Sequence, residues 1–198
     1  MTDEPTNQLR SQLENLKRKA DQQASAHAWL RDFYSFFHST LSTISLVAGV
    51  FLLAIVMASP ELISRTIGVP PEWYPWFTAL LAGGSFSVVV IQLAWRLDVK
   101  ATTHGHAVRH YTRVRYLAST ALQRGSEISA DQVAEIQREY LDDRDLPRIP
   151  EKRFLGLKRW HLMKVQVSKE LDKNPHESLR AIRRRLELDS TKEEEGRE

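Results

Sequence analysis

The sequence predicts an all-α membrane protein, built as a two-transmembrane helical hairpin with long cytoplasmic helical extensions and a small C-terminal helical segment. Three observations lead to this fold class. The chain of 198 residues has no Asp, Glu, Lys or Arg between Phe33 and Pro60, and none between Trp73 and Trp95. Helical spacing of apolar residues runs into the first of these stretches and out of the second. Basic residues gather outside the pair of stretches and not between them.

Each apolar stretch is long enough to cross a bilayer. Transmembrane helix 1 is predicted over 39–59 and transmembrane helix 2 over 76–95, and about 20 residues at about 1.5 Å each span the hydrocarbon core of roughly 30 Å. One charge at a helix centre would cost about 2.5–3.5 kcal/mol, and neither stretch contains one. The alternative is a pair of core helices in a soluble bundle, but such helices usually carry a polar face.

The distribution of Lys and Arg predicts the orientation. The external loop 60–75 holds one basic residue, Arg65, whereas several basic residues lie on the other side of each span. They include Lys17, Arg18, Lys19 and Arg31 in the segment 1–38 before the first span, and Arg96, Lys100, Arg109, Arg113 and Arg115 after the second. The positive-inside rule therefore places both termini in the cytoplasm of a multi-pass inner-membrane protein. Because about 38 residues precede the first stretch, we expect an uncleaved anchor and not a cleaved signal peptide. Aromatic residues at the span ends are typical of the headgroup layer, namely Trp73, Tyr74, Trp76 and Trp95.

Two long helices are predicted on the cytoplasmic side. The first begins near Pro5 or Thr6 and continues into the first span, with a heptad stripe that either a second subunit or the extension of the second span must cover. No Pro interrupts 95–124, so the second span is expected to continue inward as a helical stalk over 96–125, capped by Gly125. The first stripe includes Leu9, Leu13, Leu16, Ala20, Gln23, His27 and Leu30, and the stalk stripe consists of Ala107, Tyr111, Val114, Ala118 and Ala121.

The C-terminal cytoplasmic segment, 126–190, is predicted to be helical. Ser129 and Gln132 have the spacing of a capping box, which opens a helix reaching about Asp142. Helix is favoured over strand for 154–172, and Asn174 followed by Pro175 predicts a further helix start. The tail 191–198 is charged, has no apolar anchor and is expected to be disordered.

Candidate ligand-binding residues lie on the stalk. His106 and His110 have i, i+4 spacing and could share a metal ion, but packing against a neighbouring helix is the favoured interpretation, and we expect no metal or cofactor. Arg109, Arg113 and Tyr116 lie at helical spacing and could receive an anion such as a phosphate headgroup or a nucleotide. The alternative is that these arginines only set the topology.

The sequence contains no signature of an enzyme. Phosphate-binding glycine loops, zinc-protease motifs and nucleophile elbows are absent, and with no Cys there is no thiol nucleophile. The basic pI of about 9.2 follows mainly from the topology, so direct nucleic-acid binding is not expected. A second basic run, Arg180 with 183–185, is interpreted as a solvated helix face partly balanced by Glu177.

Small and polar residues recur inside the predicted spans. They occupy one face of each helix and include Ser45, Gly49, Ala79, Gly83 and Ser87, together with Gln92, the most polar residue of the second span. Residues of this kind let helix backbones approach closely. Ordinary helix packing is one interpretation, and a weakly polar pore lining is the other. Because two helices cannot enclose a channel, a pore would require several copies of the chain.

Two segments carry a resemblance to a known family. The junction with the first span reads AHAWLRDFYSFFHSTLSTISLVAGV, and the stalk reads RLDVKATTHGHAVRHYTRVRYLA. With the short Trp- and Pro-bearing loop between the spans, residues 10–125 resemble the SLATT family, the SMODS- and SLOG-associating two-transmembrane effectors of bacteria. The resemblance implies an antiphage effector that oligomerises and permeabilises the inner membrane, with a nucleotide-synthesising or nucleotide-sensing partner encoded nearby. It implies no catalytic residue.

Three hypotheses of function follow. The first is a non-enzymatic, pore-forming or membrane-disrupting homo-oligomer, acting in the lipid bilayer under a nucleotide-signalled conflict system. The alternative is a membrane-anchored scaffold that recruits a cytoplasmic partner through 126–190. The third is a metal-dependent enzyme that uses His106 and His110.

Overall fold

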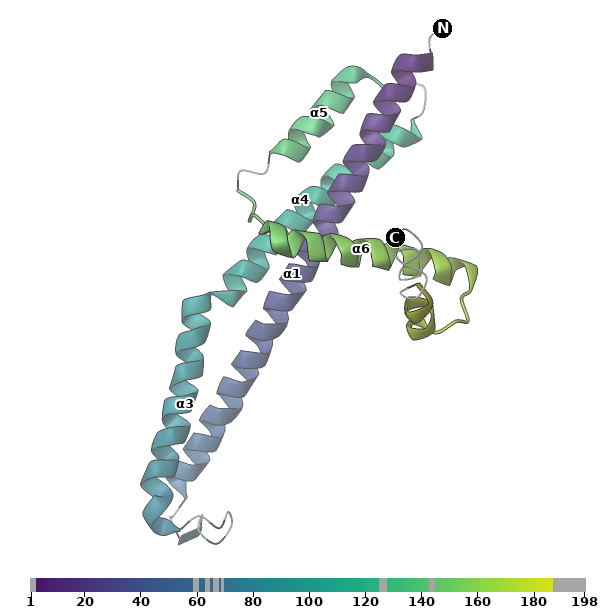
Figure 1. Cartoon of the computed structure of the whole chain (residues 1–198). Coiled ribbons are helices and arrows are strands. Elements are labelled where there is room, and N and C mark those ends of the chain that lie inside the picture. The colour runs from purple at the N-terminus through teal and green to yellow at the C-terminus, as the bar shows by residue number, and fades with distance from the viewer. Residues whose placement is uncertain are drawn as a thin grey trace. The chain divides into compact units, whose positions relative to one another are not determined.

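The computed structural model describes residues 3–58, 61–62, 65, 68, 70–124, 128–142 and 145–186, and among these it contains helices and no strand. The all-helical prediction is therefore confirmed for that part of the chain. The elements in order are α1 (Asp3–Met57), the 3₁₀ helix η1 (Pro71–Trp73), α3 (Tyr74–Trp95), α4 (Leu97–Gln123), α5 (Ala130–Leu141) and α6 (Glu151–Lys173), followed by a short helix over 179–186 (Figure 1).

The chain forms two compact units, which are described separately. Unit 1 consists of Met1–Trp29 and His106–Glu198, and unit 2 consists of Leu30–Gly105. The first predicted helix is confirmed, since α1 runs without interruption from Asp3 to Met57. Its first half belongs to unit 1 and its second half to unit 2.

The core of unit 1 is built from the predicted stripes. Leu13 and Ala20 of α1 are fully buried against Val114 and Ala118 of α4, and α5 closes the cluster with Val133 and Ile136. Burial of apolar surface stabilises such a cluster by about 25 cal/mol per Å². The heptad stripe is therefore covered from within the chain, which is one of the two alternatives that the sequence left open.

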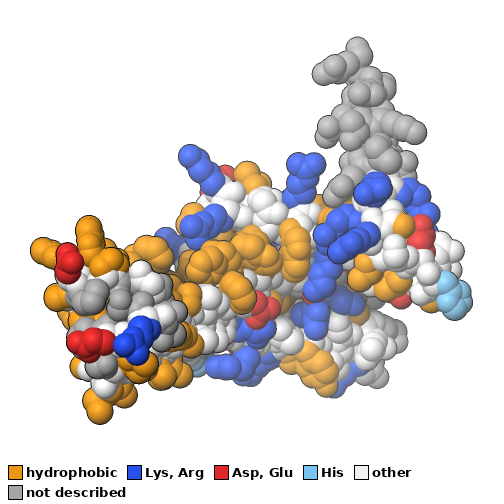
Figure 2. Space-filling view, turned by 90° about the horizontal axis from the view of Figure 1, so that it is seen from below, with side chains coloured by type: hydrophobic (Ala, Val, Ile, Leu, Met, Phe, Trp, Pro, Cys, Tyr) orange, Lys and Arg blue, Asp and Glu red, His pale blue; other side chains and the backbone are white. Residues whose placement is uncertain are grey.

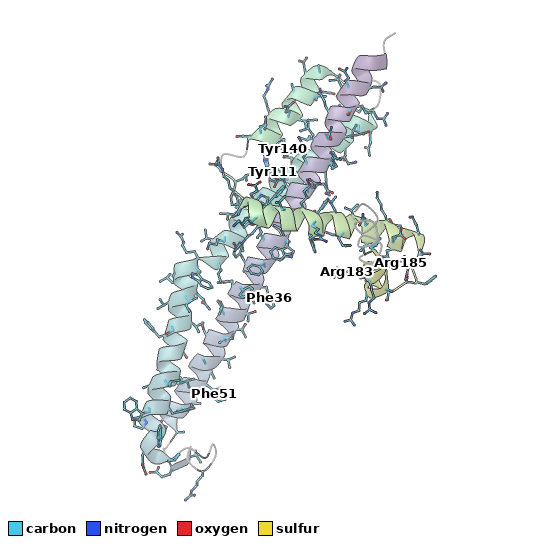
Figure 3. The ribbon with its side chains drawn as sticks, in the orientation of Figure 1. Phe36, Phe51, Tyr111, Tyr140, Arg183 and Arg185 are labelled. Carbon is cyan, nitrogen blue, oxygen red and sulfur yellow. The ribbon has the colours of Figure 1, made fainter. Side chains whose placement is uncertain are left out.

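Aromatic rings extend the core of unit 1 along α1 and α4. His27 is 2% exposed, and its ring stacks on Tyr111 with centroids 5.6 Å apart. The ring of Tyr140 from α5 lies 5.8 Å from that of Tyr111 (Figure 3). His27, a polar residue on the heptad stripe, thus packs against the ring of Tyr111 on α4.

The C-terminal helices begin and end partly as predicted. The Ser129 hydroxyl accepts a hydrogen bond from the backbone N–H of Gln132 at 3.2 Å, so it caps α5 as its spacing predicted. The choice of helix over strand for 154–172 is confirmed by α6. Gly125 and the tail 191–198 lie outside the described residues.

The predicted helix start at Asn174 is wrong. The backbone N–H of Asn174 donates to the carbonyl of Glu170 at 2.9 Å, so this residue ends α6. The following helix starts four residues later, where the Ser178 hydroxyl accepts from the N–H of Ala181 at 3.3 Å. A turn closed by a hydrogen bond from the Glu177 N–H to the Asn174 carbonyl separates the two helices.

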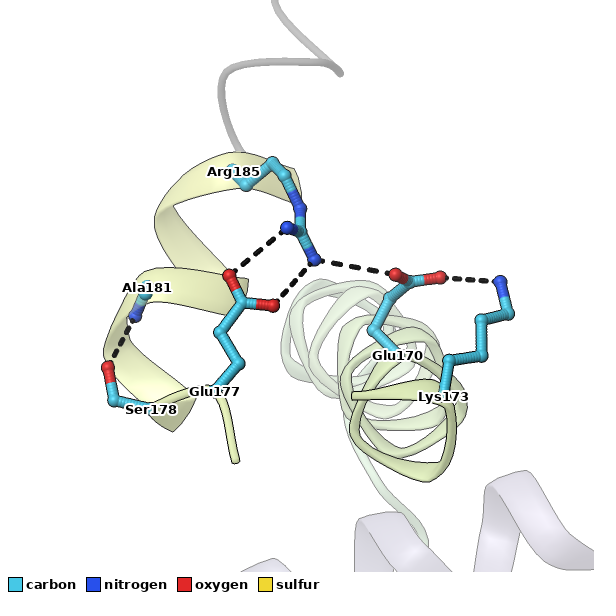
Figure 4. Close-up of polar contacts among 6 residues, drawn as sticks. All are labelled: Glu170, Lys173, Glu177, Ser178, Ala181 and Arg185. Carbon is cyan, nitrogen blue, oxygen red and sulfur yellow. Dashed lines mark hydrogen bonds and ion pairs between the residues drawn. The ribbon is translucent and has the colours of Figure 1, made fainter. Parts of the chain in front are cut away.

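An ion-pair network joins α6 to the helix 179–186. Arg185 contacts Glu177 at 3.0 Å and Glu170 at 3.4 Å, and Lys173 donates to Glu170 at 2.7 Å (Figure 4). The hydrogen bond from Lys173 lowers the pKa of the Glu170 carboxyl, and the charge of Arg185 acts in the same direction. One arginine of the predicted basic run is thus held by two carboxylates.

Unit 2 pairs the two apolar helices. The Tyr74 hydroxyl donates to the carbonyl of Ile55 at 2.6 Å, and the Gln92 amide donates to the Ser45 hydroxyl at 3.4 Å. These two contacts occur in opposite order along α1 and α3, which lie side by side in Figure 1.

The second long helix is broken, which the sequence did not predict. Arg96 adopts the left-handed conformation, φ 45° and ψ 50°, and separates α3 from α4. Its backbone N–H still donates to the Gln92 carbonyl at 3.1 Å. The absence of Pro and Gly at this position had favoured a continuous helix, but an L-residue can take this conformation at a cost of about 1–2 kcal/mol.

Candidate membrane surface and candidate anion groove

The apolar stretches of unit 2 have almost no cover within the chain. Two helices are long and apolar enough to cross a membrane, and 6% and 0% of their most apolar windows are buried. Large side chains such as Leu80 and Leu93 remain about four-fifths exposed. Phe36 and Phe51 project from α1 in Figure 3, and Figure 2 shows hydrophobic side chains gathered over one part of the surface and Lys and Arg over another. A core helix of a soluble protein would instead be mostly covered by protein.

Polar groups on these helices are satisfied locally. Hydroxyls of Thr43, Thr78, Ser85 and Ser87 donate to backbone carbonyls three or four residues earlier, at 2.8–3.0 Å. Such bonds hide a hydroxyl from an apolar medium. At the ends of α3, the indole rings of Trp76 and Trp95 are mostly exposed, as the headgroup layer favours.

The predicted packing residues divide into two groups. Ser45 and Gln92 meet each other across α1 and α3. Gly49, Ala79, Gly83 and Ser87 are exposed, and a Cβ added at either glycine would meet nothing within 4 Å. The glycines therefore do not serve a close approach between α1 and α3 of the same chain.

The histidines of the stalk do not converge on one point. His106 Nδ1 lies 3.0 Å from the Arg109 guanidinium, and the His110 ring packs edge-on against Tyr111 with centroids 5.2 Å apart. Among the described residues, no group of three His, Cys, Asp or Glu is placed to hold a metal ion. In unit 2, His104 stacks on Tyr34 at 5.6 Å, and burial lowers the pKa of His104.

The predicted anion contact does not form as a single site. Arg109 lies against His106, while Arg113 pairs with Glu139 of α5 at 3.5 Å. Tyr116 is 68% exposed and lines a different groove. The three residues have the i, i+4, i+7 spacing of one helix face, but each of them has different neighbours in the structure.

A groove of about 980 Å³ in unit 1 collects cationic side chains from three helices. The α1 wall contributes Lys17 and Asp21, the α4 wall Arg115, and the α6 wall His161 and Lys169. Asp21 is shared, because its carboxylate lies 2.6 Å from the Arg115 guanidinium and 3.7 Å from His161 Nε2. A volume of this size is typical of a small-molecule site.

Sequence reasoning missed most of this groove. The α4 contribution has a readable signal, because Thr112, Arg115, Tyr116 and Ser119 have the i, i+3, i+4, i+7 spacing of one helix face. The contributions of α1 and α6 depend on tertiary packing, for which local spacing holds no signal.

Comparisons with protein-family models, with curated proteins and with solved structures find no match to this chain. The function proposed below therefore depends on the geometry of the two units and on the resemblance of the sequence.

Proposed function

We propose that the chain is a two-span membrane protein that assembles into an oligomer and permeabilises the bacterial inner membrane. The resemblance to SLATT proteins adds that it acts as the effector of a nucleotide-signalled antiphage system, with both termini in the cytoplasm. One observation carries the proposal: α3 and the part of α1 that belongs to unit 2 keep most of their apolar surface unburied, whereas the apolar stripes of unit 1 are covered by protein. Lipid tails are the medium that would solvate such surfaces without cost.

Oligomer formation is part of the proposal because two helices cannot enclose a pore. The exposed face with Gly49 on α1 and the exposed face with Ala79, Gly83 and Ser87 on α3 are free for contact with another copy. Small residues favour close helix packing in lipid. The nucleotide-synthesising or nucleotide-sensing partner is expected to be encoded nearby and to control the assembly.

Permeabilisation is tested in cells that express the chain with its neighbouring genes. We expect loss of membrane potential and entry of an impermeant dye after the system is activated, and neither in cells that lack the chain. Purified protein should also release dye from lipid vesicles. An intact membrane potential under activating conditions would overturn the proposal.

A matched pair of variants tests the assembly face. Gly83→Leu should reduce cross-linked oligomers and dye release about tenfold, because added bulk separates the helices. Gly84→Leu is the control, since Gly84 is equally exposed, also has nothing within 4 Å of an added Cβ, and lies about 100° around the helix. If both variants reduced assembly equally, or if neither reduced it, assembly through the Gly83 face would be contradicted.

The second candidate function is a membrane-anchored scaffold. It is favoured by exposed leucines of unit 1, among them Leu141 on α5 and Leu155 on α6, both about 60% exposed. Replacing both spans by an unrelated two-span hairpin separates the candidates. A scaffold that recruits its partner through 126–190 would keep its activity, whereas a pore would lose it.

A further inference from the structure

The groove between α1, α4 and α6 of unit 1 has an excess of positive charge. Five Lys or Arg side chains and two carboxylates line it. Both carboxylates are occupied, Asp21 by Arg115 at 2.6 Å and Glu14 by Arg10 at 3.4 Å. Lys17 and Lys169 have no ion-pair or hydrogen-bond partner among the described residues. Cations without counter-charges on facing walls of a groove attract an anion.

A buried histidine marks the same groove. His161 is 5% exposed, and its Nδ1 has no hydrogen-bond partner in the described part of the chain. Buried polar atoms of native proteins are usually hydrogen-bonded, so an unpartnered one calls for an explanation. Because almost no solvent reaches this atom, a ligand oxygen would supply the missing partner once the imidazole ring turns its Nδ1 toward the groove. This observation is independent of the surface lysines, because it concerns a side chain that solvent hardly reaches.

The remaining walls suit the uncharged part of a ligand. Leu162 and Val165 of α6 line the groove beside Tyr116 of α4, and the hydroxyls of Thr112 and Ser119 add donors. A volume of about 980 Å³ is far larger than a bare phosphate needs. The apolar side chains leave room for an organic group next to the anion.

We infer that this groove binds a small organic phosphate, with the phosphate between Lys17, Lys169 and His161 and the uncharged group against Leu162 and Tyr116. Lysine ammonium groups bind phosphate as point charges, and a histidine ring nitrogen adds a directed hydrogen bond. Two sources present this chemistry, a soluble phosphate ester and the headgroup of an anionic lipid. The inference does not require the chain to permeabilise a membrane.

Calorimetry tests the site on the full chain in phosphatidylcholine nanodiscs, with inorganic pyrophosphate as the probe. We expect saturable binding that Lys169→Gln and Lys17→Gln each weaken about tenfold, as the loss of a charge-assisted contact does. Lys158→Gln is the matched control, because Lys158 is an exposed lysine of α6 that does not line the groove. His161→Phe, checked for folding by circular dichroism, should weaken binding as well. If His161→Phe fails to fold, the variants of the exposed residues Lys17 and Lys169 still test the site.

The second arm of the experiment distinguishes the sources of phosphate. If the site takes a soluble phosphate ester, pyrophosphate should bind equally well in nanodiscs with and without phosphatidylglycerol. Competition by phosphatidylglycerol that Lys169→Gln abolishes would assign the site to a lipid headgroup. Absence of pyrophosphate binding in phosphatidylcholine nanodiscs overturns the inference, and so does equal weakening by Lys158→Gln. No readout involves permeability, so failure of the proposed pore and failure of this site are distinguishable.

Discussion

The two halves of α1 place the same residue types in opposite surroundings. In unit 1, Leu13 and Ala20 are fully buried, whereas in unit 2, Leu46 and Leu53 of the same helix are about two-thirds exposed. Unit 1 follows the rule for water, where an amphipathic helix covers its apolar stripe. Most of the large apolar side chains of α1 in unit 2 break that rule. The difference is what the proposed two-span membrane protein requires, with one half of α1 in water and the other in lipid.

The sequence of each half of α1 already shows this difference between a covered and an uncovered apolar surface. The stripe of unit 1 alternates with charged residues, so only one face can be buried. The second half is apolar around the whole helix, and no single neighbour could cover it. A helix that is hydrophobic all round needs either a large protein core or lipid, and unit 2 offers no such core among its described residues.

The largest expected effect sharpens this contrast directly. Leu13→Ala should lower the free energy of unfolding by about 2–5 kcal/mol, because it leaves a cavity in the core of unit 1. Leu46→Ala on the same helix should change it by less than about 0.5 kcal/mol, because no protein atoms collapse around an exposed side chain. Urea unfolding of the detergent-solubilised protein, followed by circular dichroism, measures both. Equal losses in the two variants would mean that the halves of α1 are packed alike.

The next effect concerns the cap of α5, which closes the core of unit 1. Ser129→Ala should cost about 1 kcal/mol, because the N–H of Gln132 loses its partner. Ser168→Ala makes the same chemical change at an exposed position inside α6 and should be close to neutral. Thermal unfolding of the two variants compares them. A cost at Ser168 as large as that at Ser129 would show that the cap hydrogen bond is not the cause.

Sequence reasoning succeeded where one helix determines its own pattern. The long first helix, the stripe from Ala107 to Ala121 and the Ser129 cap depend on residue spacing within one segment, and the structure contains each of them. The partner of the heptad stripe stayed open, because a stripe does not specify what covers it. The structure supplies that partner within the chain, in α4 and α5.

Sequence reasoning failed where two segments compete or meet. Asn174 and Ser178 are both suitable N-cap residues for the last helix. The hydrogen bond from the Asn174 N–H to the Glu170 carbonyl shows that Asn174 instead ends α6, and Ser178 caps the helix 179–186. The left-handed Arg96 carries no Gly or Pro signal. The groove between α1, α4 and α6 was missed because residues far apart in the sequence, such as Lys17 and Lys169, line it together. The groove is thus set by tertiary packing and not by local spacing.

The smallest expected effect is a pH dependence from unit 2. Burial lowers the pKa of His104 below its usual value of 6.5, because water cannot hydrate the charged form of the buried ring. Between the lowered pKa and 6.5 the unfolded chain binds more protons than the folded chain, so folding stability falls as the pH falls through that window. The thermal midpoint should therefore drop as the pH falls below about 6.5.

Substitution of His104 isolates this contribution. His104→Gln should remove part of the pH-dependent drop, while His106→Gln, at an exposed histidine two residues further along α4, should leave the drop as it is. Both variants lose one imidazole, but only His104→Gln removes a buried one. A drop that both variants reduce equally would locate the proton uptake outside the His104–Tyr34 stack. A drop that only His104→Gln reduces would show that unit 2 holds a protein-covered ring directly beside helices whose apolar surfaces stay uncovered.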